Sequence, residues 1–252
     1  MERRHSRADA FPEPIRHVPS LSIIIPTRRL DGALARRIDT SLRHLPDSEV
    51  LVVEPEAADP KRPADLPAAA NCRRLTGPRG RGTQCNAGAR AASGGLLLFL
   101  HDDTELPANA AALIDDAFAH SGASVACFRL RFDHPHPLLG LYGWFSRFDS
   151  YLTSFGDQGI LIRRELFEAM GGFPDWPLFE DVELLRRARR RTRIRKLPAA
   201  VTTSAVRYVR HGVVRQQALN ASLMLRFALG ATPQALLASY ERRRGNPRPA
   251  DP

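Results

Sequence analysis

The chain has 252 residues, of which 43% are hydrophobic, so it is long and apolar enough to bury a core, and intrinsic disorder is excluded. Its 37 Lys plus Arg exceed its 27 Asp plus Glu, and the formal charge of +10 favours nucleic acid, anionic lipid or a phosphorylated ligand as a partner. Three cysteines without a CxxC pair argue against a disulfide scaffold and a cysteine zinc site, and they fit a reducing cytosol.

The first half of the chain alternates apolar runs with segments of helical composition. Strands are predicted at residues 21–25 (LSIII), 49–53 (EVLVV), 71–75 and 96–100 (LLLFL). Helices are predicted at 33–43 and 83–92, and a surface loop at 55–70. This βαβ order predicts an α/β fold with a mainly parallel sheet, in which ligands lie beyond the carboxyl ends of the strands.

The second half is less regular. Helices are predicted at 109–121, in part of the aromatic segment 137–154, in a short stretch ending at 170, and at 180–191, 213–229 and 233–243. Strands are predicted at 124–132, 159–163 and within 194–203, and a loop at 155–158. The last two helices predict a helical C-terminal tail behind the α/β unit.

Two acidic residues, Asp102 and Asp103, directly follow the most apolar strand. Carboxylate oxygens suit Mg²⁺ or Mn²⁺, and such ions commonly keep waters and ligand phosphates in their shell. The alternative from the spacing alone is a solvated turn in which Asp103 or Thr104 caps the next helix.

A second acidic pair, Glu180 and Asp181, opens a predicted helix, and Asp157 with Gln158 lies on an earlier loop. A carboxylate within hydrogen-bond reach of a substrate hydroxyl can act as a general base. The alternative is charge complementarity with the positive end of the helix dipole. The glycine-rich, basic segment 77–88 precedes a helix and suits an anion, although it has neither a Walker lysine nor a full GxGxxG pattern.

Eight basic residues crowd into positions 186–196, and we interpret this run as a solvated helix face, because no interleaved aromatic residues offer a platform for nucleic-acid bases. The tail helices mix leucine and phenylalanine with arginine, so they either pack on the domain or lie on an anionic membrane. No apolar run reaches the roughly 18 to 20 residues that cross a bilayer, and residues 1–19 contain no apolar core of a secretory signal.

Taken in order, these pieces resemble family 2 glycosyltransferases of the GT-A fold over nearly the whole chain. The residues that carry the resemblance are SIIIPT (22–27), EVLVVE (49–54), GRGTQCNAGARAASG (80–94), LLLFLHDDTELP (96–107), the segment from GDQG to FEDVEL and its arginines (156–190), and SAVRYVRHGVVR (204–215). HDDT, GDQG and FEDVEL look more narrowly like a bacterial subgroup associated with arsenosugar biosynthesis.

The resemblance implies an inverting, metal-dependent transferase that moves a sugar from a nucleotide-sugar donor, expected to be UDP-linked, to an unknown acceptor hydroxyl. It implies that Asp103, with Asp102 beside it, binds Mn²⁺ or Mg²⁺ on the donor diphosphate, and that Asp181 is the catalytic base. The implied substrate-binding residues are Pro26, Thr27, Glu54 and Arg81 in the nucleotide pocket, Asp157 and Gln158 at the donor sugar or acceptor, Glu180 beside the base, and Arg207 over the diphosphate.

Some positions depart from the family pattern. The loop after the first strand reads TRRLDG where relatives usually have an Asn-Glu pair, and Glu54 replaces the commoner Asp. Asp102 stands where Ala is usual, and Tyr208 where Trp is usual. The altered positions cluster around the expected nucleobase site, whereas the expected metal and base positions are intact.

The expected organisation is a flexible segment at 1–19, a GT-A domain at 20–212 and a helical tail at 213–252 on the domain or on membrane. We expect a cytoplasmic protein, peripheral to the inner face of the membrane if the tail binds lipid, without a nucleic-acid partner. Two other functions stay open from the sequence. One is a sugar-1-phosphate nucleotidyltransferase, which should carry a glycine-rich signature near the first strand, and the other is a non-enzymatic arginine-rich module that binds nucleic acid or membrane.

Overall fold

A computed structural model describes residues 20–28, 30–56 and 71–244. The segment 1–19 and nearly all of the loop expected at 55–70 lie outside the described residues. Within the described part, no helix is both long enough and apolar enough to cross a membrane.

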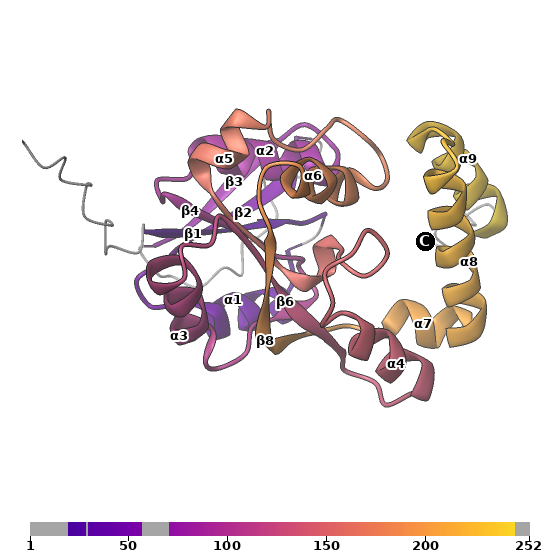
Figure 1. Cartoon of the computed structure of the whole chain (residues 1–252), viewed down its shortest axis with the longest axis horizontal. Coiled ribbons are helices and arrows are strands. Elements are labelled where there is room, and N and C mark those ends of the chain that lie inside the picture. The colour runs from indigo at the N-terminus through magenta and orange to yellow at the C-terminus, as the bar shows by residue number, and fades with distance from the viewer. Residues whose placement is uncertain (1–19, 29, 57–70, 245–252) are drawn as a thin grey trace, which may run out of the picture.

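One mixed sheet forms the centre of the molecule (Figure 1). In the described part it has eight strands, in the order β3-β2-β1-β4-β7-β6-β8-β5. Their bounds are β1 (Leu21–Pro26), β2 (Glu49–Pro55), β3 (Cys72–Gly77), β4 (Leu96–Phe99), β5 (Thr104–Glu105), β6 (Val125–Phe132), β7 (Ile160–Arg163) and β8 (Ile194–Thr203). Strands β3, β2, β1 and β4 are parallel neighbours, as are β6 and β8, whereas β7 runs antiparallel to both β4 and β6. The α/β fold predicted from the sequence, with a mostly parallel sheet and C-terminal helices, is confirmed.

Helices cover both faces of the sheet and extend into the C-terminal tail. They are α1 (Gly32–His44), α2 (Arg81–Ala91), α3 (Ala110–Asp115), α4 (Pro137–Phe145), α5 (Arg164–Ala169), α6 (Glu180–Arg189), α7 (Val206–His211), α8 (Val213–Ala228) and α9 (Pro233–Arg244). A π-helical turn, Asp116–His120, continues α3, and a 3₁₀ turn, Gly156–Gln158, precedes β7.

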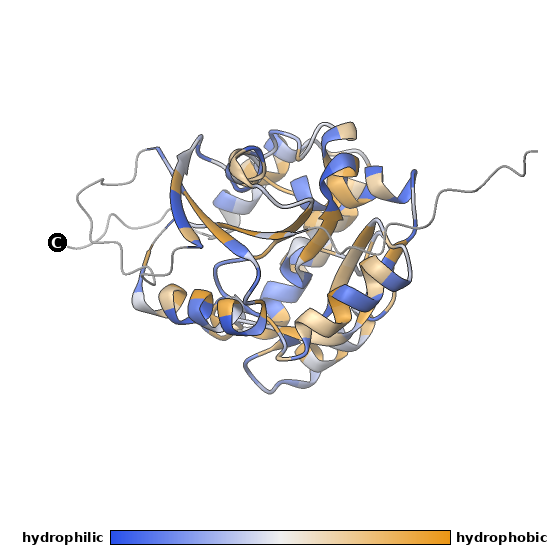
Figure 2. Cartoon of the chain, turned by 90° about the vertical axis from the view of Figure 1, so that its left-hand side faces the viewer, coloured by the Kyte–Doolittle hydropathy of each residue, from blue (hydrophilic) through white to orange (hydrophobic). Residues whose placement is uncertain are grey.

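The side chains of the strands alternate between two apolar layers. Ile23, Ile25 and Val52 pack with residues of α1 and α3, whereas Ile24 and Val53 face α2, α5 and α6. In Figure 2 the central strands are mainly apolar, while polar segments lie mainly on the outer sides of the helices. Because both faces are covered, the open positions for a ligand are the loops at the strand ends.

The structure differs from the sequence-based prediction in segments where tertiary contacts determine the backbone conformation. The helix expected at 109–121 is α-helical only to Asp115 and then widens into the π-turn. Thr104, considered as a helix cap, instead pairs with Thr203 across the short strand β5. The additional helix α7 was not predicted, and the aromatic segment at 137–154 is helical only over α4.

The C-terminal tail returns to the α/β unit. Leu223 and Met224 of α8 are buried, and Phe227 stacks on Phe179, the residue before α6, with ring centroids 4.8 Å apart. This part of α8 therefore contacts the segment that leads into α6.

Candidate active site

The carboxyl ends of β1, β2 and β4 bring polar residues to one edge of the sheet, facing the N-termini of α2 and α6. Thr27 follows β1, Glu54 lies near the end of β2, and residues 101–103 follow β4. Arg81 begins α2, while Glu180 and Asp181 begin α6. This is the edge at which the parallel topology predicts a ligand site.

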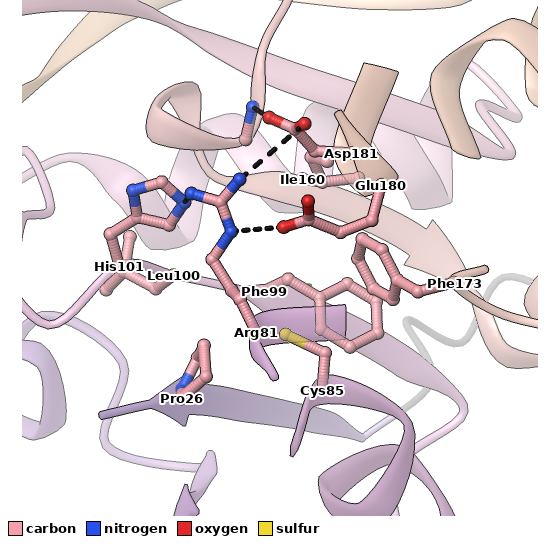
Figure 3. Close-up of a pocket in the computed structure, with 11 residues that line it drawn as sticks. Pro26, Arg81, Cys85, Phe99, Leu100, His101, Ile160, Phe173, Glu180 and Asp181 are labelled. Carbon is pink, nitrogen blue, oxygen red and sulfur yellow. Dashed lines mark hydrogen bonds and ion pairs between the residues drawn. The ribbon is translucent and has the colours of Figure 1, made fainter. Parts of the chain in front are cut away.

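Arg81 is the centre of the polar cluster (Figure 3). Its Nε donates to Oε1 of the buried Glu180, and its Nη2 lies 3.7 Å from Oδ1 of Asp181. Its Nη1 is 3.2 Å from Nε2 of His101. The pocket around the guanidinium is also lined by Cys85, Phe99, Ile160 and Phe173, and by Pro26. Arg81 thus joins the acidic pair of α6 to the loop after β4.

Asp181 is held by backbone amides. Its Oδ2 accepts a hydrogen bond from the Gly156 amide at 2.6 Å, and its Oδ1 accepts from the Val182 amide at 2.9 Å. A Cβ on Gly156 would lie 2.8 Å from Oδ2 of Asp181 and 3.2 Å from Nε2 of His101. The first turn of α6 adds the positive end of the helix dipole, which favours a carboxylate. The geometry therefore fixes this carboxylate through two backbone amides.

Phe179 places this pair through an unusual backbone conformation. Its φ of 63° is the only positive value of a non-glycine residue in the described part of the chain. A bulky residue in the left-handed region is strained and persists only where surrounding contacts hold it. Those contacts are aromatic, because Phe227 of α8 stacks on Phe179 and is also close to Tyr151 and Trp176.

His101 is neutral near pH 7. Burial lowers its pKa to about 4, and the charge of Arg81 acts in the same direction. A neutral imidazole accepts a hydrogen bond at one ring nitrogen and donates one from the other. Beside Arg81 it adds no charge to the site.

Asp157 is a carboxyl group with an unsatisfied oxygen. Its Oδ1 is buried and has no hydrogen-bond partner. Burial, together with the negative charges of Asp181 and Asp103, raises the pKa of Asp157 to about 7. A buried polar atom without a partner is costly unless a ligand or a water satisfies it, so Asp157 is a candidate contact for the substrate.

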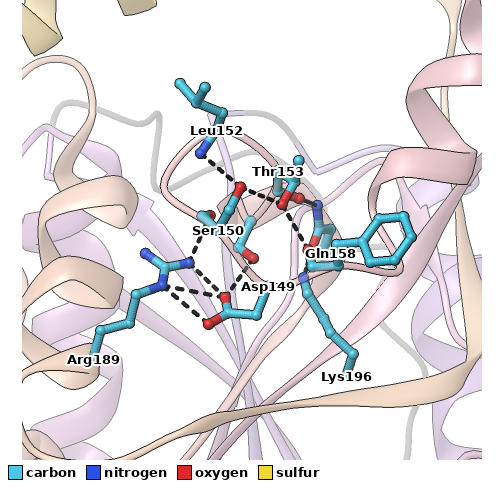
Figure 4. Close-up of polar contacts among 9 residues, drawn as sticks. Asp149, Ser150, Leu152, Thr153, Gln158, Arg189 and Lys196 are labelled. Atoms are coloured by element: carbon cyan, nitrogen blue, oxygen red, sulfur yellow. Dashed lines mark hydrogen bonds and ion pairs between the residues drawn. The ribbon is translucent and has the colours of Figure 1, made fainter.

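The loop that carries Asp157 and Gln158 is fixed by a separate polar network (Figure 4). Lys196 of β8 donates to Oε1 of Gln158, whose Nε2 donates to the Thr153 backbone oxygen at 2.6 Å. Arg189 of α6 forms an ion pair with Asp149 at 2.6 Å. These bonds attach the loop to both α6 and β8 and so keep it beside the acidic pair.

The two aspartates expected to bind metal point to different neighbours. Asp102 accepts a hydrogen bond from the Thr27 hydroxyl at 2.7 Å, and burial raises its pKa. Asp103 has only long contacts, at 3.3 Å, with the hydroxyls of Thr104 and Thr203. In the described part of the chain, no group of three or more His, Cys, Asp or Glu side chains is arranged to hold an ion. The hard oxygen donors of the pair suit Mg²⁺ or Mn²⁺, provided that phosphate oxygens and waters complete the shell.

The remaining residues predicted to bind substrate are more dispersed. Glu54 is buried and forms an ion pair with Arg74 of β3. Arg207 is exposed on α7, and its charge lowers the pKa values of both His101 and Asp102. The structure therefore brings Arg81, Glu180 and Asp181 together, while Thr27 joins Asp102, and Glu54 stands apart in its own ion pair.

No protein-family model and no curated protein sequence matches the chain. Solved structures do match it. The mannosyltransferase PcManGT from Pyrobaculum calidifontis, in complex with GDP-Man and Mn²⁺, matches with a TM-score of 0.61 at 19% identity, over 96% of this chain and 74% of that one. The chain has a GT-A fold.

A second GT-A structure agrees. S. aureus TarS 1-349 matches with a TM-score of 0.56 at 18% identity, over 74% of this chain and 60% of that one. Its complex with UDP-GlcNAc matches with a TM-score of 0.54 at 18% identity, over 73% and 58%. The chain thus spans about three-fifths of the TarS fragment that it matches.

Some residues of this GT-A site were not assigned a role from the sequence. His101 was quoted within HDDT, after the most apolar strand, without a role of its own, and Lys196 lies in the run interpreted as a solvated helix face. Gly156 was quoted within GDQG without a function. In the sequence, Gly156 is marked only by its place beside Asp157 in a predicted loop. Its contact with Asp181 joins positions 25 residues apart, so this contact is visible only in the folded structure.

Proposed function

We propose that this chain is an inverting glycosyltransferase that moves a sugar from a nucleotide-sugar donor to an acceptor hydroxyl. The observation that carries the proposal is Asp181, a carboxylate held by the Gly156 amide at 2.6 Å at the ligand-binding edge of a GT-A fold. The mannosyltransferase and UDP-GlcNAc complexes among the matching structures support a nucleotide-sugar as the donor.

In the proposed reaction Asp181 takes the proton of the acceptor hydroxyl as its oxygen attacks the anomeric carbon of the donor. The bond between that carbon and the diphosphate oxygen breaks, and the nucleoside diphosphate leaves with the electron pair. Arg81 contacts Glu180 and Asp181 and supplies positive charge beside them, and the exposed Arg207 is proposed to meet the diphosphate.

Asp102 and Asp103 would hold Mn²⁺ or Mg²⁺. When bound, the ion supplies positive charge that neutralises the departing diphosphate. The long, weak contacts of Asp103 leave its oxygens accessible to such a ligand. The Mn²⁺ in the PcManGT complex supports a divalent ion in this fold.

Pro26, Thr27 and Glu54 are proposed to line the nucleotide pocket, with a UDP-linked donor, and Asp157 and Gln158 to contact the donor sugar or the acceptor. The unsatisfied Oδ1 of Asp157 supports its role. Membership of family 2, its arsenosugar-associated subgroup and a cytoplasmic location remain proposals that rest on the sequence motifs.

The test is a panel of nucleotide-sugars, with and without Mn²⁺, read first by thermal shift and then by release of nucleoside diphosphate. A donor raises the melting temperature by mass action, and the wild type should release its nucleoside diphosphate. Asp181→Asn should lower the rate by 10³-fold or more, on the order expected for loss of a base, while it retains the thermal shift. The matched control is Asp175→Asn, which changes an exposed carboxylate in the loop before α6.

Three results would refute the proposal. They are no thermal shift with any donor, a normal rate in Asp181→Asn, or release of pyrophosphate from a nucleoside triphosphate. The last result would instead identify a nucleotidyltransferase.

A further inference from the structure

Helix α4 leaves most of its large side chains exposed. It meets the core through Leu139, which is buried, and at its end Ser146 is buried and its hydroxyl accepts a hydrogen bond from the Leu130 amide at 2.7 Å. A Cβ on Gly143 would lie only 2.7 Å from the Leu130 oxygen. Other large residues point outward, with Leu141 52% exposed and Trp144 45% exposed. A soluble domain rarely leaves such side chains together in water unless they bind something.

Neighbouring elements extend this apolar surface. The ring of Phe132 contacts Tyr142 of α4 on one side and Tyr208 of α7 on the other, which places the two helices side by side (Figure 1). Val209 of α7 and His134, just before α4, line one shared depression. We call this surface the α4–α7 face, and its exposed large apolar residues are Leu138, Leu141, Trp144, Phe145, Phe148, Val206 and Val209.

The charge on the α4–α7 face is positive. Residues 134–148 and 204–240 contain no Asp or Glu, but they include Arg147, Arg207, Arg210 and Arg215, all exposed. The Arg147 guanidinium lies 4.9 Å from the centre of the Trp144 ring. Asp133 also lines the shared depression, where it accepts a hydrogen bond from the Ala205 amide, and Asp149 at the margin pairs with Arg189.

We propose that the α4–α7 face docks on the surface of an anionic lipid bilayer. Aliphatic and aromatic side chains would enter the boundary between head groups and acyl chains, and the arginines would meet lipid phosphates. A second copy of the chain fits less well, because a two-fold contact would place this arginine-rich face against itself and bring like charges together. This surface differs from the one expected on the tail helices, whose Leu223 and Phe227 pack inward.

The α4–α7 face is linked to the candidate active site. Tyr142 on its inner side contacts Phe155, with ring centroids 6.2 Å apart, and Phe155 precedes Gly156, which holds Asp181. If the proposed transferase function is correct, docking would bring the candidate active site close to the lipid surface.

The test is co-sedimentation of the full chain with vesicles of phosphatidylcholine alone, or of equal parts phosphatidylcholine and phosphatidylglycerol. The wild type should bind the anionic vesicles, and binding should weaken as salt is raised. The double variant Trp144→Ser, Phe148→Ser should bind about tenfold or more weakly, since it removes two large apolar contacts. The matched control is Leu229→Ser at the end of α8, which removes a leucine that is 78% exposed outside the face and should leave binding unchanged.

A wild type that does not sediment with anionic vesicles, or a double variant that binds as the wild type does, would overturn the proposal. A wild-type dimer that the double variant dissociates, without vesicle binding, would assign the face to a second copy. Melting temperatures of all variants show whether they fold. The thermal shift with nucleotide-sugars is measured on the same samples, so failure of lipid binding is distinguishable from failure of the transferase function.

Discussion

At the scale of single residues, the orientation of Asp181 depends on main-chain donors. Gly156 and Val182 each contribute an amide, while Arg81 approaches no closer than 3.7 Å. Amides of a folded backbone cannot rotate away as a side chain can, so the carboxylate is pre-oriented. The absence of a side chain at position 156 is what permits the short approach.

Gly156→Ala should therefore lower kcat by about 100-fold, because its methyl group would displace Asp181 and small misplacements of a reacting group cost on that order. Steady-state kinetics with the donor identified by the panel measure the effect. The control is Gly140→Ala, where a new Cβ meets nothing within 4 Å. A Gly156→Ala enzyme with unchanged kcat would mean that the orientation of Asp181 is not limiting.

The raised pKa of Asp157 predicts how the free energy of unfolding changes with pH. The folded protein holds the proton of Asp157 up to about pH 7, whereas an unfolded chain releases it near pH 4. The folded state binds more protons in that window, so the free energy of unfolding should fall as the pH rises through it.

Asp157→Asn removes this titration. Its melting temperature relative to the wild type should be higher at pH 8 than at pH 5, as measured by differential scanning fluorimetry in matched buffers. Asp175→Asn, at an exposed position, should show no such trend. A constant difference between Asp157→Asn and the wild type at both pH values would show that Asp157 ionises normally.

At the scale of elements, α8 supports the entry of α6. Phe227 is half-buried against Phe179, Tyr151 and Trp176, three aromatic residues from loops around the acidic pair. The strained backbone at Phe179 is adjacent to Glu180, so a loss of this packing would loosen the start of α6.

Phe227→Ala should reduce the free energy of unfolding by about 2 kcal/mol and also lower kcat, since Phe179 loses its stacking partner. Phe227→Tyr should restore both values, and Leu229→Ala, an exposed position in the same turn of the chain, should change neither. Chemical denaturation and steady-state kinetics provide the measurements. Destabilisation with an unchanged kcat would limit Phe227 to a structural role.

Element types were largely predictable, because β-branched runs and helical spacing are local signals. The strands at 21–25, 49–53 and 96–100 and the helices at 33–43 and 180–191 were all predicted near their observed bounds. The short strand β5 was not predicted, because two residues show no periodicity. The strand exists only through its pairing with Thr203 and its neighbour in β8. The π-turn after Asp115 likewise has no sequence pattern.

The candidate site was predicted in part for the same reason. Its acidic members lie at strand or helix ends that the sequence marks, so Asp103 and Asp181 were proposed from local motifs and the family resemblance. The contacts of Arg81 with Glu180 and of Lys196 with Gln158 join positions 99 and 38 residues apart. Charge composition alone does not reveal which arginine or lysine makes such a contact.

At the scale of the whole molecule, the net charge of +10 is unevenly distributed. Within the basic run at 186–196, Arg186 and Arg187 pair with Glu183, Arg189 with Asp149, and Arg195 with Asp116. These ion pairs lower the positive charge that the run presents to a phosphate backbone.

The chain should accordingly form no complex with duplex DNA or single-stranded RNA in gel-shift assays at about 150 mM salt, because part of the basic run is held in ion pairs and salt screens the rest. Small basic proteins that are known to bind nucleic acid serve as positive controls. A shifted band that persists at this salt would revive the alternative of an arginine-rich binding module.

The two tryptophans lie in different parts of the molecule, so their fluorescence can report on each part. Trp176 belongs to the aromatic group around Phe227 and Phe179, whereas Trp144 stands on the outer side of α4. Replacing either one with phenylalanine leaves a single tryptophan. Donor binding near α6 and lipid contact at α4 would then change the fluorescence of different variants. One unlabelled protein can therefore show in which order the two events occur.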